Sequence, residues 1–219
     1  MSSPSDAITG ILHPGVKQYM EGLAPEQSDL LGRLEAYAHE RGFPLVGRHS
    51  GRVMEMMARL SGARRVYEFG SGFGYSAYFF ARAVGESGEV HGAEKDAWEL
   101  EAHARLYGES ALRTRIHIHQ GDAFEVLDQL EGVFDVFFLD LDKVDYPRAL
   151  DVALSRLAPG GLILADNVLW GGKTAQVADK EDDGTRALQR YNEESHRHVE
   201  LETVILPVGD GLAVSRKVS

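Results

Sequence analysis

From Arg65 to about residue 194, short apolar runs alternate with segments of helical pattern, and this alternation constrains the fold more than any other feature. A strand, a helix and a further strand in succession form a parallel pair joined by a right-handed crossover. The sequence therefore predicts an α/β fold around a mostly parallel sheet, with helices on both faces. The five expected parallel strands are RVYEF (65–69), EVHGAE (89–94), RIHIHQ (115–120), FDVFFLD (134–140) and GLILAD (161–166).

The end of the chain breaks this alternation. VELETVILP (199–207) and GLAVSRK (211–217) are strand-like and are separated by the turn VGDG, with no helix between them. Such runs pair as an antiparallel hairpin. We expect this hairpin at one edge of the sheet, which brings the expected number of strands to seven. The stretch before the hairpin, around 186–194, has a helical pattern.

From Pro14 to Leu60 the sequence is helical in pattern. One helix is expected after Pro25 and ends near Gly42, and a second precedes the first strand. We assign residues 1–62 to helices that belong to the same domain as the ligand-binding core at 63–219. The side chains expected to face the core are Leu30, Leu31, Leu34, Tyr37 and Ala38 in the first helix, and Val53, Met54, Met57 and Leu60 in the second.

Composition narrows the class of protein. The chain has 219 residues, no cysteine and a formal net charge of −11. Disulfides and thiolate metal sites are therefore excluded, and a broad nucleic-acid or anionic-lipid surface is disfavoured. No apolar run approaches the length of a membrane span. We expect a cytoplasmic single-domain protein whose partners are small molecules, not nucleic acid or membrane.

A glycine-rich loop follows the first expected strand, in EFGSGFGYS (68–76). Glycines at 70, 72 and 74 let the backbone approach a ligand closely. The spacing G-x-G-x-G differs from the dinucleotide fingerprint G-x-G-x-x-G. Glu68 favours a ligand with a cationic end over a pyrophosphate. S-adenosylmethionine fits this description, and a structural turn without a ligand is the alternative.

Two further acids follow the next strands. Glu94 ends the second strand, where an acid commonly accepts hydrogen bonds from ribose hydroxyls. Asp122 follows the third and is placed to reach an adenine ring. Ordinary exposed acids are the alternative for each, but together they favour a nucleoside site.

Oxygen donors follow strands four and five. Asp140 and Lys143 end the fourth, and Asp166 and Asn167 end the fifth. Because these strands are expected to be neighbours, the donors converge, and an all-oxygen set selects Mg²⁺, Mn²⁺ or Ca²⁺. The alternative is a turn, since Asp and Asn also bend loops through local hydrogen bonds.

The motifs EFGSGFGYS, GDAFEVL, FDVFFLDLDKVDY, LAPGGLILADNVLWGG and LPVGDGLAVSRK, in this order, resemble those of the cation-dependent O-methyltransferases of the catechol and caffeoyl-coenzyme A type. The resemblance implies a Rossmann-like class I methyltransferase fold of seven strands, a homodimer, and N-terminal helices that cover the acceptor pocket. It further implies that Lys143 is the general base, with Asp140 also in the catalytic set. The implied metal ligands are Asp140, Asp166 and Asn167, and the implied cofactor contacts are Val46, Glu68, Gly70, Gly72, Ser76, Glu94, Asp122, Ala123 and Asp140.

The predicted function is S-adenosylmethionine-dependent, metal-dependent methylation of a hydroxyl on a small aromatic ortho-diol. Tyr146 and Trp170 either form the wall of an aromatic acceptor site or simply pack. The alternatives are a methyltransferase for another small molecule, a nicotinamide-dependent oxidoreductase and a non-catalytic adenosylmethionine-binding module. We interpret His117, His119, His196 and His198 as structural residues, and the acidic stretch 179–184 as a solvated loop or a lid.

Overall fold

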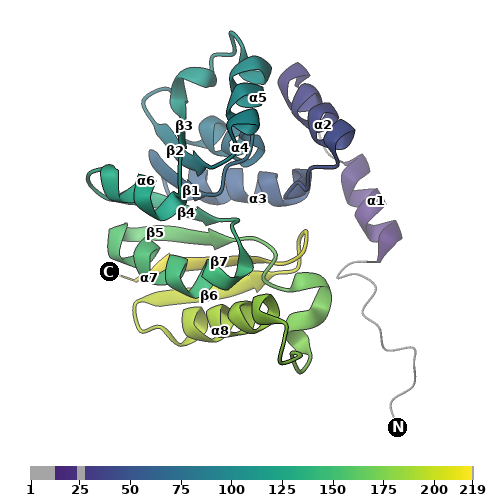
Figure 1. The fold of residues 1–219 in the computed structure, drawn as a ribbon, viewed down its shortest axis with the longest axis vertical. Helices are drawn as coiled ribbons and strands as arrows, with labels where there is room; N and C mark the ends of the chain where they lie inside the picture. The colour runs from purple at the N-terminus through teal and green to yellow at the C-terminus, as the bar shows by residue number, and fades with distance from the viewer. Residues whose placement is uncertain (1–12, 24–27, 219) are drawn as a thin grey trace.

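Five consecutive apolar runs form parallel strands at the centre of the protein, as the alternation predicts (Figure 1). The computed structural model describes residues 13–23 and 28–218. Its sheet has seven strands in the order β3-β2-β1-β4-β5-β7-β6, and β7 is antiparallel to both neighbours. The predicted fold class is confirmed. The strands are β1 (Arg65–Phe69), β2 (Glu89–Glu94), β3 (Ile116–Gln120), β4 (Phe134–Leu139), β5 (Leu157–Ala165), β6 (Leu201–Leu206) and β7 (Leu212–Lys217).

The strand order reverses between β1 and β4, which are adjacent although two strands separate them in the chain. In open α/β sheets, ligands bind outside the carboxyl ends of the strands at such a switch point. Phe69 pairs with Leu139 there, and Leu139 pairs with Ala165 of β5. The residues that follow β1, β4 and β5 therefore meet at one edge of the sheet.

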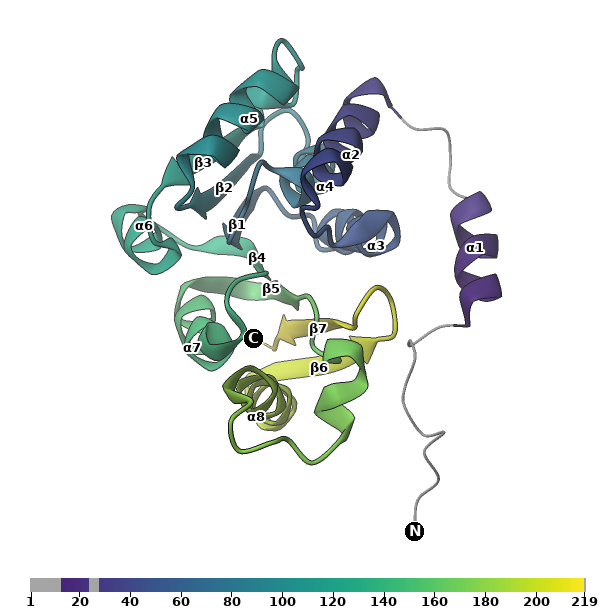
Figure 2. The ribbon, with the colours of Figure 1, turned by 45° about the vertical axis from the view of Figure 1, so that its right-hand side comes forward.

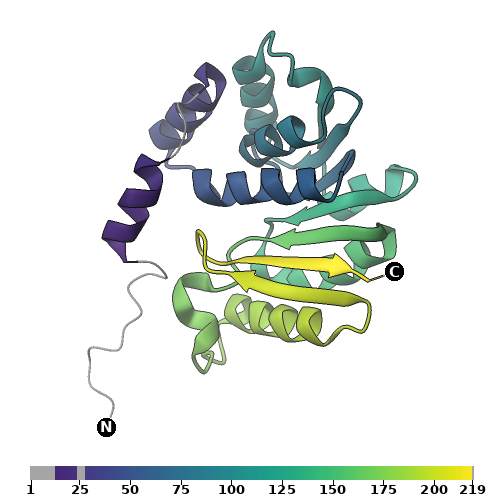
Figure 3. The same ribbon diagram turned by 180° about the vertical axis from the view of Figure 1, so that it is seen from behind.

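Helices cover both faces of the sheet, as Figures 2 and 3 show from two sides. α2, α3, α4 and α5 lie on one face, and α6, α7 and α8 lie on the other. α1 lies at the periphery, away from the sheet (Figure 2). The helices are α1 (Pro14–Gly22), α2 (Asp29–Arg41), α3 (Gly47–Leu60), α4 (Tyr75–Ala83), α5 (Ala97–Tyr107), α6 (Ala123–Gln129), α7 (Tyr146–Arg156) and α8 (Asp183–Arg197), with 3-10 turns at Arg113–Arg115, Lys143–Asp145 and Trp170–Ala175.

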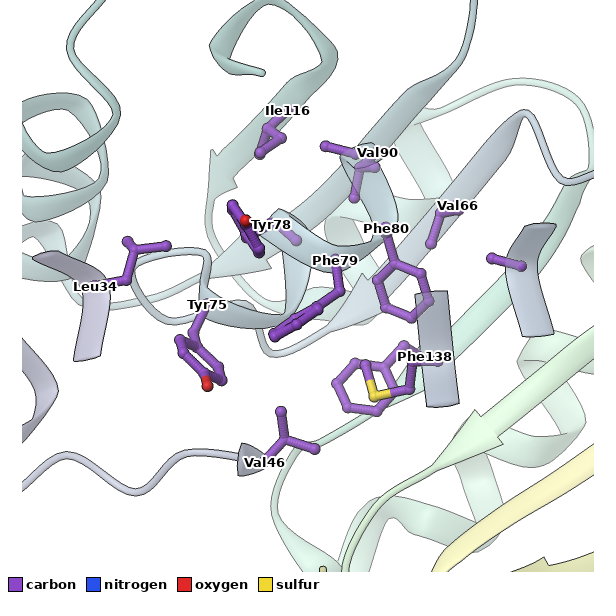
Figure 4. Close-up of a cluster of buried hydrophobic side chains, with 14 of the residues drawn as sticks. Leu34, Val46, Val66, Tyr75, Tyr78, Phe79, Phe80, Val90, Ile116 and Phe138 are labelled. Atoms are coloured by element: carbon purple, nitrogen blue, oxygen red, sulfur yellow. The ribbon is translucent and has the colours of Figure 1, made fainter. Parts of the chain in front are cut away.

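Aromatic side chains of α4 fill the core on the first face (Figure 4). Phe79 and Phe80 are almost completely buried, and Phe80 packs against Phe138 of β4. α3 lies close to α4 because Gly51 faces Phe79, where an added Cβ would be 2.4 Å from the ring atom Cε2. This packing fixes the first turn of α3 above the sheet.

The structure corrects the prediction for α3. Met54 is buried, and Val53 and Met57 are partly buried, but Leu60 is 76% exposed. The face toward α4 consists mainly of small residues around Gly51, so an apolar stripe identifies it poorly. In α2, by contrast, all five expected side chains are buried, and Gly42 ends the helix in the left-handed conformation with φ of 63°. Pro25 lies outside the described residues.

The bounds of β5 and α8 differ most from the prediction. β5 begins at Leu157, four residues before the expected start at Gly161, because residues 157–160 continue the strand despite a proline and a glycine. α8 spans Asp183–Arg197 and so extends beyond 186–194 at both ends. The predicted acidic loop therefore ends as the first turn of α8, where Asp182 caps the helix through the N–H group of Thr185 at 2.9 Å.

Candidate active site

The glycine-rich loop between β1 and α4 passes close to the end of β4. Gly70 has φ of 86°, and an added Cβ would lie 2.4 Å from the carbonyl oxygen of Asp140. Gly72 has φ of 50°, and its added Cβ would lie 2.8 Å from the ring of Phe43. Only glycine both adopts a positive φ readily and lacks a Cβ, so only glycine fits these two positions. The loop therefore lies against the β4 end on one side and against the segment before α3 on the other.

Two cavities of about 190 and 240 Å³ lie beside this loop and share Gly70 and Glu94. Together they fall within the range of about 300–1,000 Å³ that is typical of small-molecule sites. Eight of the nine predicted cofactor residues line one cavity or both. These are Val46, Gly70, Gly72, Ser76, Glu94 and Asp140 in the first cavity, and Gly70, Glu94, Asp122 and Ala123 in the second.

Glu68, the ninth, lies beneath the loop and is completely buried. Burial raises the pKa of Glu68 to about 8, although the nearby hydroxyl groups of Ser76 and Ser71 oppose the rise. The hydroxyl of Ser71 donates to Oε2 at 3.2 Å, whereas Oε1 has no hydrogen-bond partner among the described residues. A buried acceptor without a partner is unusual and favours a ligand that carries a donor or a positive charge.

Glu94 and Asp122 have structural contacts as well. Glu94 accepts hydrogen bonds from the N–H groups of Gly72 at 3.0 Å and Asp96 at 2.8 Å, and so ties the loop to the end of β2. Asp122 caps α6 through the N–H group of Phe124 at 2.9 Å. A hydrogen bond from Lys95 lowers the pKa of Asp122, and their ion pair is 2.9 Å long. Both acids therefore line a cavity and also stabilise the backbone around it through these hydrogen bonds.

Sequence analysis missed the segment Phe43, Pro44 and Leu45, which closes the first cavity together with Val46. A proline two residues after Gly42, which ends α2, is a loop signal, but loop signals do not reveal what a loop covers. Phe43 packs edge-to-face on Phe73 at 5.2 Å between ring centroids. The segment between α2 and α3 thus forms a wall of the cavity.

The predicted metal ligands lie together at the ends of β4 and β5, around the ammonium group of Lys143. Lys143 Nζ donates to Asn167 Oδ1 at 2.7 Å and lies 3.3 Å from Asp140 Oδ1. Asn167 Nδ2 donates to Asp166 Oδ2 at 3.3 Å. The oxygens are therefore arranged about a positive charge. Asp140 also lines the first cavity, so this cluster and the predicted cofactor site are contiguous.

The electrostatics of the cluster fit a divalent cation. Burial, and then the negative charge of Asp140, raise the pKa of Asp166 to about 7. Burial also raises the pKa of Asp140, while Lys143 opposes the rise. Asp166 Oδ1 is buried and has no hydrogen-bond partner among the described residues. Two carboxylates and a carboxamide are the ligand chemistry of Mg²⁺, Mn²⁺ and Ca²⁺.

Within residues 13–23 and 28–218, no group of three or more His, Cys, Asp or Glu side chains is placed to hold a metal ion. The cluster at β4 and β5 has a different composition, because one of its three oxygen donors is the carboxamide of Asn167. His91 and His119 contact each other at 3.1 Å on β2 and β3, away from this cluster.

Tyr146 and Trp170 differ in position. Tyr146 is completely buried, as the packing alternative expects. Its hydroxyl lies 2.9 Å from Asp166 O and 3.2 Å from Leu139 O, and it accepts a hydrogen bond from Lys143 at 3.0 Å. The ring of Trp170 is partly exposed and lies 5.6 Å from Lys143 Nζ. The Tyr146 hydroxyl therefore connects Lys143 to the ends of β4 and β5, and Trp170 lies beside Lys143.

Comparison with known proteins identifies the family. A family model described as "O-methyltransferase" matches residues 25–218. The chain belongs to this family. It is 29% identical to the catechol O-methyltransferase of Niastella koreensis over 211 residues, which cover 91% of this chain and 95% of that protein. It is also 29% identical to the caffeoyl-CoA O-methyltransferase of Petroselinum crispum, over 77% of this chain and 75% of that protein.

Solved structures of O-methyltransferases have the same fold as this chain. The O-methyltransferase TomG from Streptomyces achromogenes, involved in tomaymycin synthesis and solved in complex with SAM, superposes with a TM-score of 0.84 at 25% identity. The superposition covers 94% of this chain and 96% of that chain. An O-methyltransferase from Bacillus cereus in complex with SAH shares the fold, with a TM-score of 0.83 at 22% identity, over 93% and 97% of the two chains.

These findings confirm, at the level of the family, the prediction of an S-adenosylmethionine-dependent O-methyltransferase of the catechol and caffeoyl-CoA type. The nicotinamide-dependent oxidoreductase is thereby set aside. None of the helices in the described part of the chain combines the length and apolar character needed to cross a membrane.

Proposed function

We propose that this O-methyltransferase transfers a methyl group from S-adenosylmethionine to a hydroxyl of a small aromatic ortho-diol, with a divalent cation held by Asp140, Asp166 and Asn167. The observation that carries the proposal is the oxygen cluster around the Lys143 ammonium group, which adjoins the cavity through Asp140. The preferred ion is Mg²⁺, and Mn²⁺ or Ca²⁺ would suit the same ligands.

The two cavities beside the glycine-rich loop are the proposed binding site of the methyl donor. Buried Glu68, with its unpartnered Oε1, favours a positively charged ligand end at the loop. Glu94 and Asp122 retain free lone pairs and suit the ribose and the base of a nucleoside. S-adenosylmethionine bound there would supply an electrophilic methyl group.

Lys143 is the proposed general base. Its side-chain nitrogen lies within hydrogen-bond distance of Asn167 Oδ1, Asp140 Oδ1 and the Tyr146 hydroxyl. As the neutral amine, this nitrogen would accept the proton of the acceptor hydroxyl. General-base assistance is typically worth about 10²–10⁴-fold in rate. A divalent cation in the cluster supplies Lewis-acid stabilisation of the acceptor's oxyanion. Trp170, beside Lys143, is proposed to pack on the acceptor ring and exclude water.

An ortho-diol is the acceptor chemistry that the names of the two curated relatives share, because a catechol and a caffeoyl group both carry one. The alternative is methylation of a small molecule that lacks an ortho-diol. A non-catalytic adenosylmethionine-binding module is disfavoured, because binding of the cofactor alone does not require the metal-ligand residues Asp140, Asp166 and Asn167. The finer predictions of a cytoplasmic homodimer remain proposals that cell fractionation and light scattering test.

The decisive experiment incubates the pure protein with methyl-labelled S-adenosylmethionine, Mg²⁺ and a panel of ortho-diphenols, meta-diphenols and monophenols. We expect label in the ortho-diphenols only, and loss of transfer in excess chelator. Asp166→Ala should abolish metal-dependent transfer while calorimetry shows cofactor binding largely retained. Asp128→Ala, in α6 and away from the cluster, is the control. Full activity in chelator would refute the metal mechanism, and transfer to monophenols alone would refute the acceptor class.

A further inference from the structure

The turn between β6 and β7 (residues 207–211) contacts the active site although it lies far from the predicted site residues in the sequence. It hydrogen-bonds to residues 167–172, which follow β5 and are called the β5 loop here. Val168 N–H donates to Gly211 O and Leu169 N–H donates to Asp210 O, both at 3.0 Å. Gly171 N–H donates to the carboxylate oxygen Oδ1 of Asp210 at 2.6 Å.

The β5 loop has an unfavourable backbone conformation. Asn167 and Trp170, with φ of 57° and 49°, are the only non-glycine residues at positive φ in the described parts of the chain. Gly171 and Gly172 continue the left-handed conformation, with φ of 60° and 84°. A side chain with a Cβ disfavours this region. The loop therefore depends on contacts from outside to keep Asn167 and Trp170 where they are.

The turn is itself fixed from two sides. Gly211 has φ of 89°, and an added Cβ there would lie 2.5 Å from Leu169 Cγ, so Leu169 packs directly on the turn backbone. An added Cβ at Gly209 would lie 2.5 Å from the hydroxyl of Ser50, in the first turn of α3. The turn thus sits between α3 and the β5 loop, and this placement sets the position of the Asp210 carboxylate.

We propose that Asp210 is a positioning residue of the active site, which holds Asn167 and Trp170 in place by accepting the hydrogen bond from Gly171 N–H. Trp170 directly precedes Gly171 in the chain. Asn167 begins the same loop, and its side chain binds the ammonium group of Lys143 at 2.7 Å. A carboxylate acceptor forms a stronger and shorter hydrogen bond than a neutral one. The functional importance of this positioning rests on the function proposed above for Asn167 and Trp170.

The test follows the loop itself by fluorescence. The chain has two tryptophans, and Trp98 is 67% exposed, so Trp98→Phe leaves Trp170 as the sole reporter. In this background we expect Asp210→Ala to shift Trp170 emission to longer wavelength and to increase its quenching by acrylamide. Asp210→Asn retains an acceptor oxygen of the same shape, although a neutral one, and should change both less than Asp210→Ala does. Asp210→Glu, which displaces the carboxylate by one methylene group, carries the same test if Asp210→Ala does not fold.

Asp135→Ala is the matched control. Its carboxylate also accepts backbone hydrogen bonds, from the N–H groups of Arg64 and Arg65 at 2.8 and 2.9 Å, but at the amino end of β4, whereas the site lies at the carboxyl end. It should leave Trp170 emission unchanged. A second readout is the affinity for Mn²⁺ in the presence of S-adenosylmethionine, which should fall about 10-fold or more in Asp210→Ala, as is typical for loss of a residue that orients a metal ligand.

Unchanged emission and unchanged Mn²⁺ affinity in Asp210→Ala would overturn the proposal. A change in Asp210→Asn as large as that in Asp210→Ala would also overturn it, because the negative charge and not the acceptor oxygen would then matter. Absence of Mn²⁺ binding in the wild type would instead refute the proposed cation site, while Trp170 emission would still decide the role of Asp210.

Discussion

Replacement of Glu68 by glutamine should change how the stability of the protein depends on pH. Glu68 is completely buried, and burial raises its pKa to about 8 from an ordinary value of 4.5. Between these two values the folded protein binds one proton more than the unfolded chain. The stabilising effect of that proton is present at low pH and is lost as pH rises through about 8.

The expected magnitude follows from this interval. Each pH unit between the unfolded and the folded pKa is worth about 1.4 kcal/mol. Between pH 6 and pH 9 the wild type should therefore lose about 3 kcal/mol of unfolding free energy through Glu68 alone. Glu68→Gln has nearly the same shape and does not titrate. Its stability relative to the wild type should rise by about the same 3 kcal/mol over that range.

Urea unfolding of both proteins at pH 6, 7, 8 and 9, without cofactor and with chelator present, measures this difference. Contributions of the other titratable groups are common to both proteins and cancel in the comparison. Glu200→Gln, at an exposed position, is the control and should run parallel to the wild type. Parallel curves for Glu68→Gln and the wild type would show that Glu68 ionises normally inside the protein, and would refute the reasoning from burial.

Three further predictions concern other sites. Tyr146→Phe removes the hydroxyl that contacts two strand-end carbonyls and Lys143, and should cost about 1–3 kcal/mol in urea unfolding; an unchanged midpoint would contradict this. Burial lowers the pKa of His91 in the folded protein below the ordinary value of 6.5. The contribution of neutral His91 to the unfolding free energy is therefore complete above pH 6.5 and is lost as the pH falls through the lowered pKa. His91→Gln should weaken that loss, and an equally steep loss would exclude His91 as a cause. Gly51→Ala places a methyl group 2.4 Å from the Phe79 ring and should cost about 1–3 kcal/mol by overpacking, whereas Gly22→Ala, with nothing within 4 Å, should show no such effect in thermal unfolding.

The sheet could be predicted from sequence because its strands are nearly continuous apolar runs. β1 and β2 have the expected bounds, since each run is buried on both faces and polar residues or glycines mark its ends. The start of β5 could not be predicted, because Pro159 and Gly160 interrupt the pattern while the backbone stays extended. Leu60 was assigned to the core wrongly because α3 packs through small residues, and a hydrophobic stripe does not report backbone proximity.

The candidate site was partly predictable for a related reason. Asp140 and Asp166 follow strands that adjoin in the sheet, so the order of the strands alone brings them together. Phe43 and Asp210 reach the site from a loop between helices and from a hairpin turn, and nothing in their local sequence states what those loops contact. Tyr146 lies in the predicted region and is buried there, and its hydroxyl contacts two strand-end carbonyl groups and Lys143.

The candidate active site contains more acidic than basic side chains, which favours the binding of cationic ligands. Glu68 and Asp166 are buried, and the pKa of each is raised, to about 8 and about 7. Without ligand, their ionised forms are therefore costly near neutral pH, and Lys143 compensates only part of the charge. A cationic ligand end at Glu68 and a divalent cation at Asp166 would remove separate parts of this cost, because each would neutralise a different buried carboxylate. Each ligand should then stabilise the folded protein by itself, by about 2.7 kcal/mol at 100 times its dissociation constant.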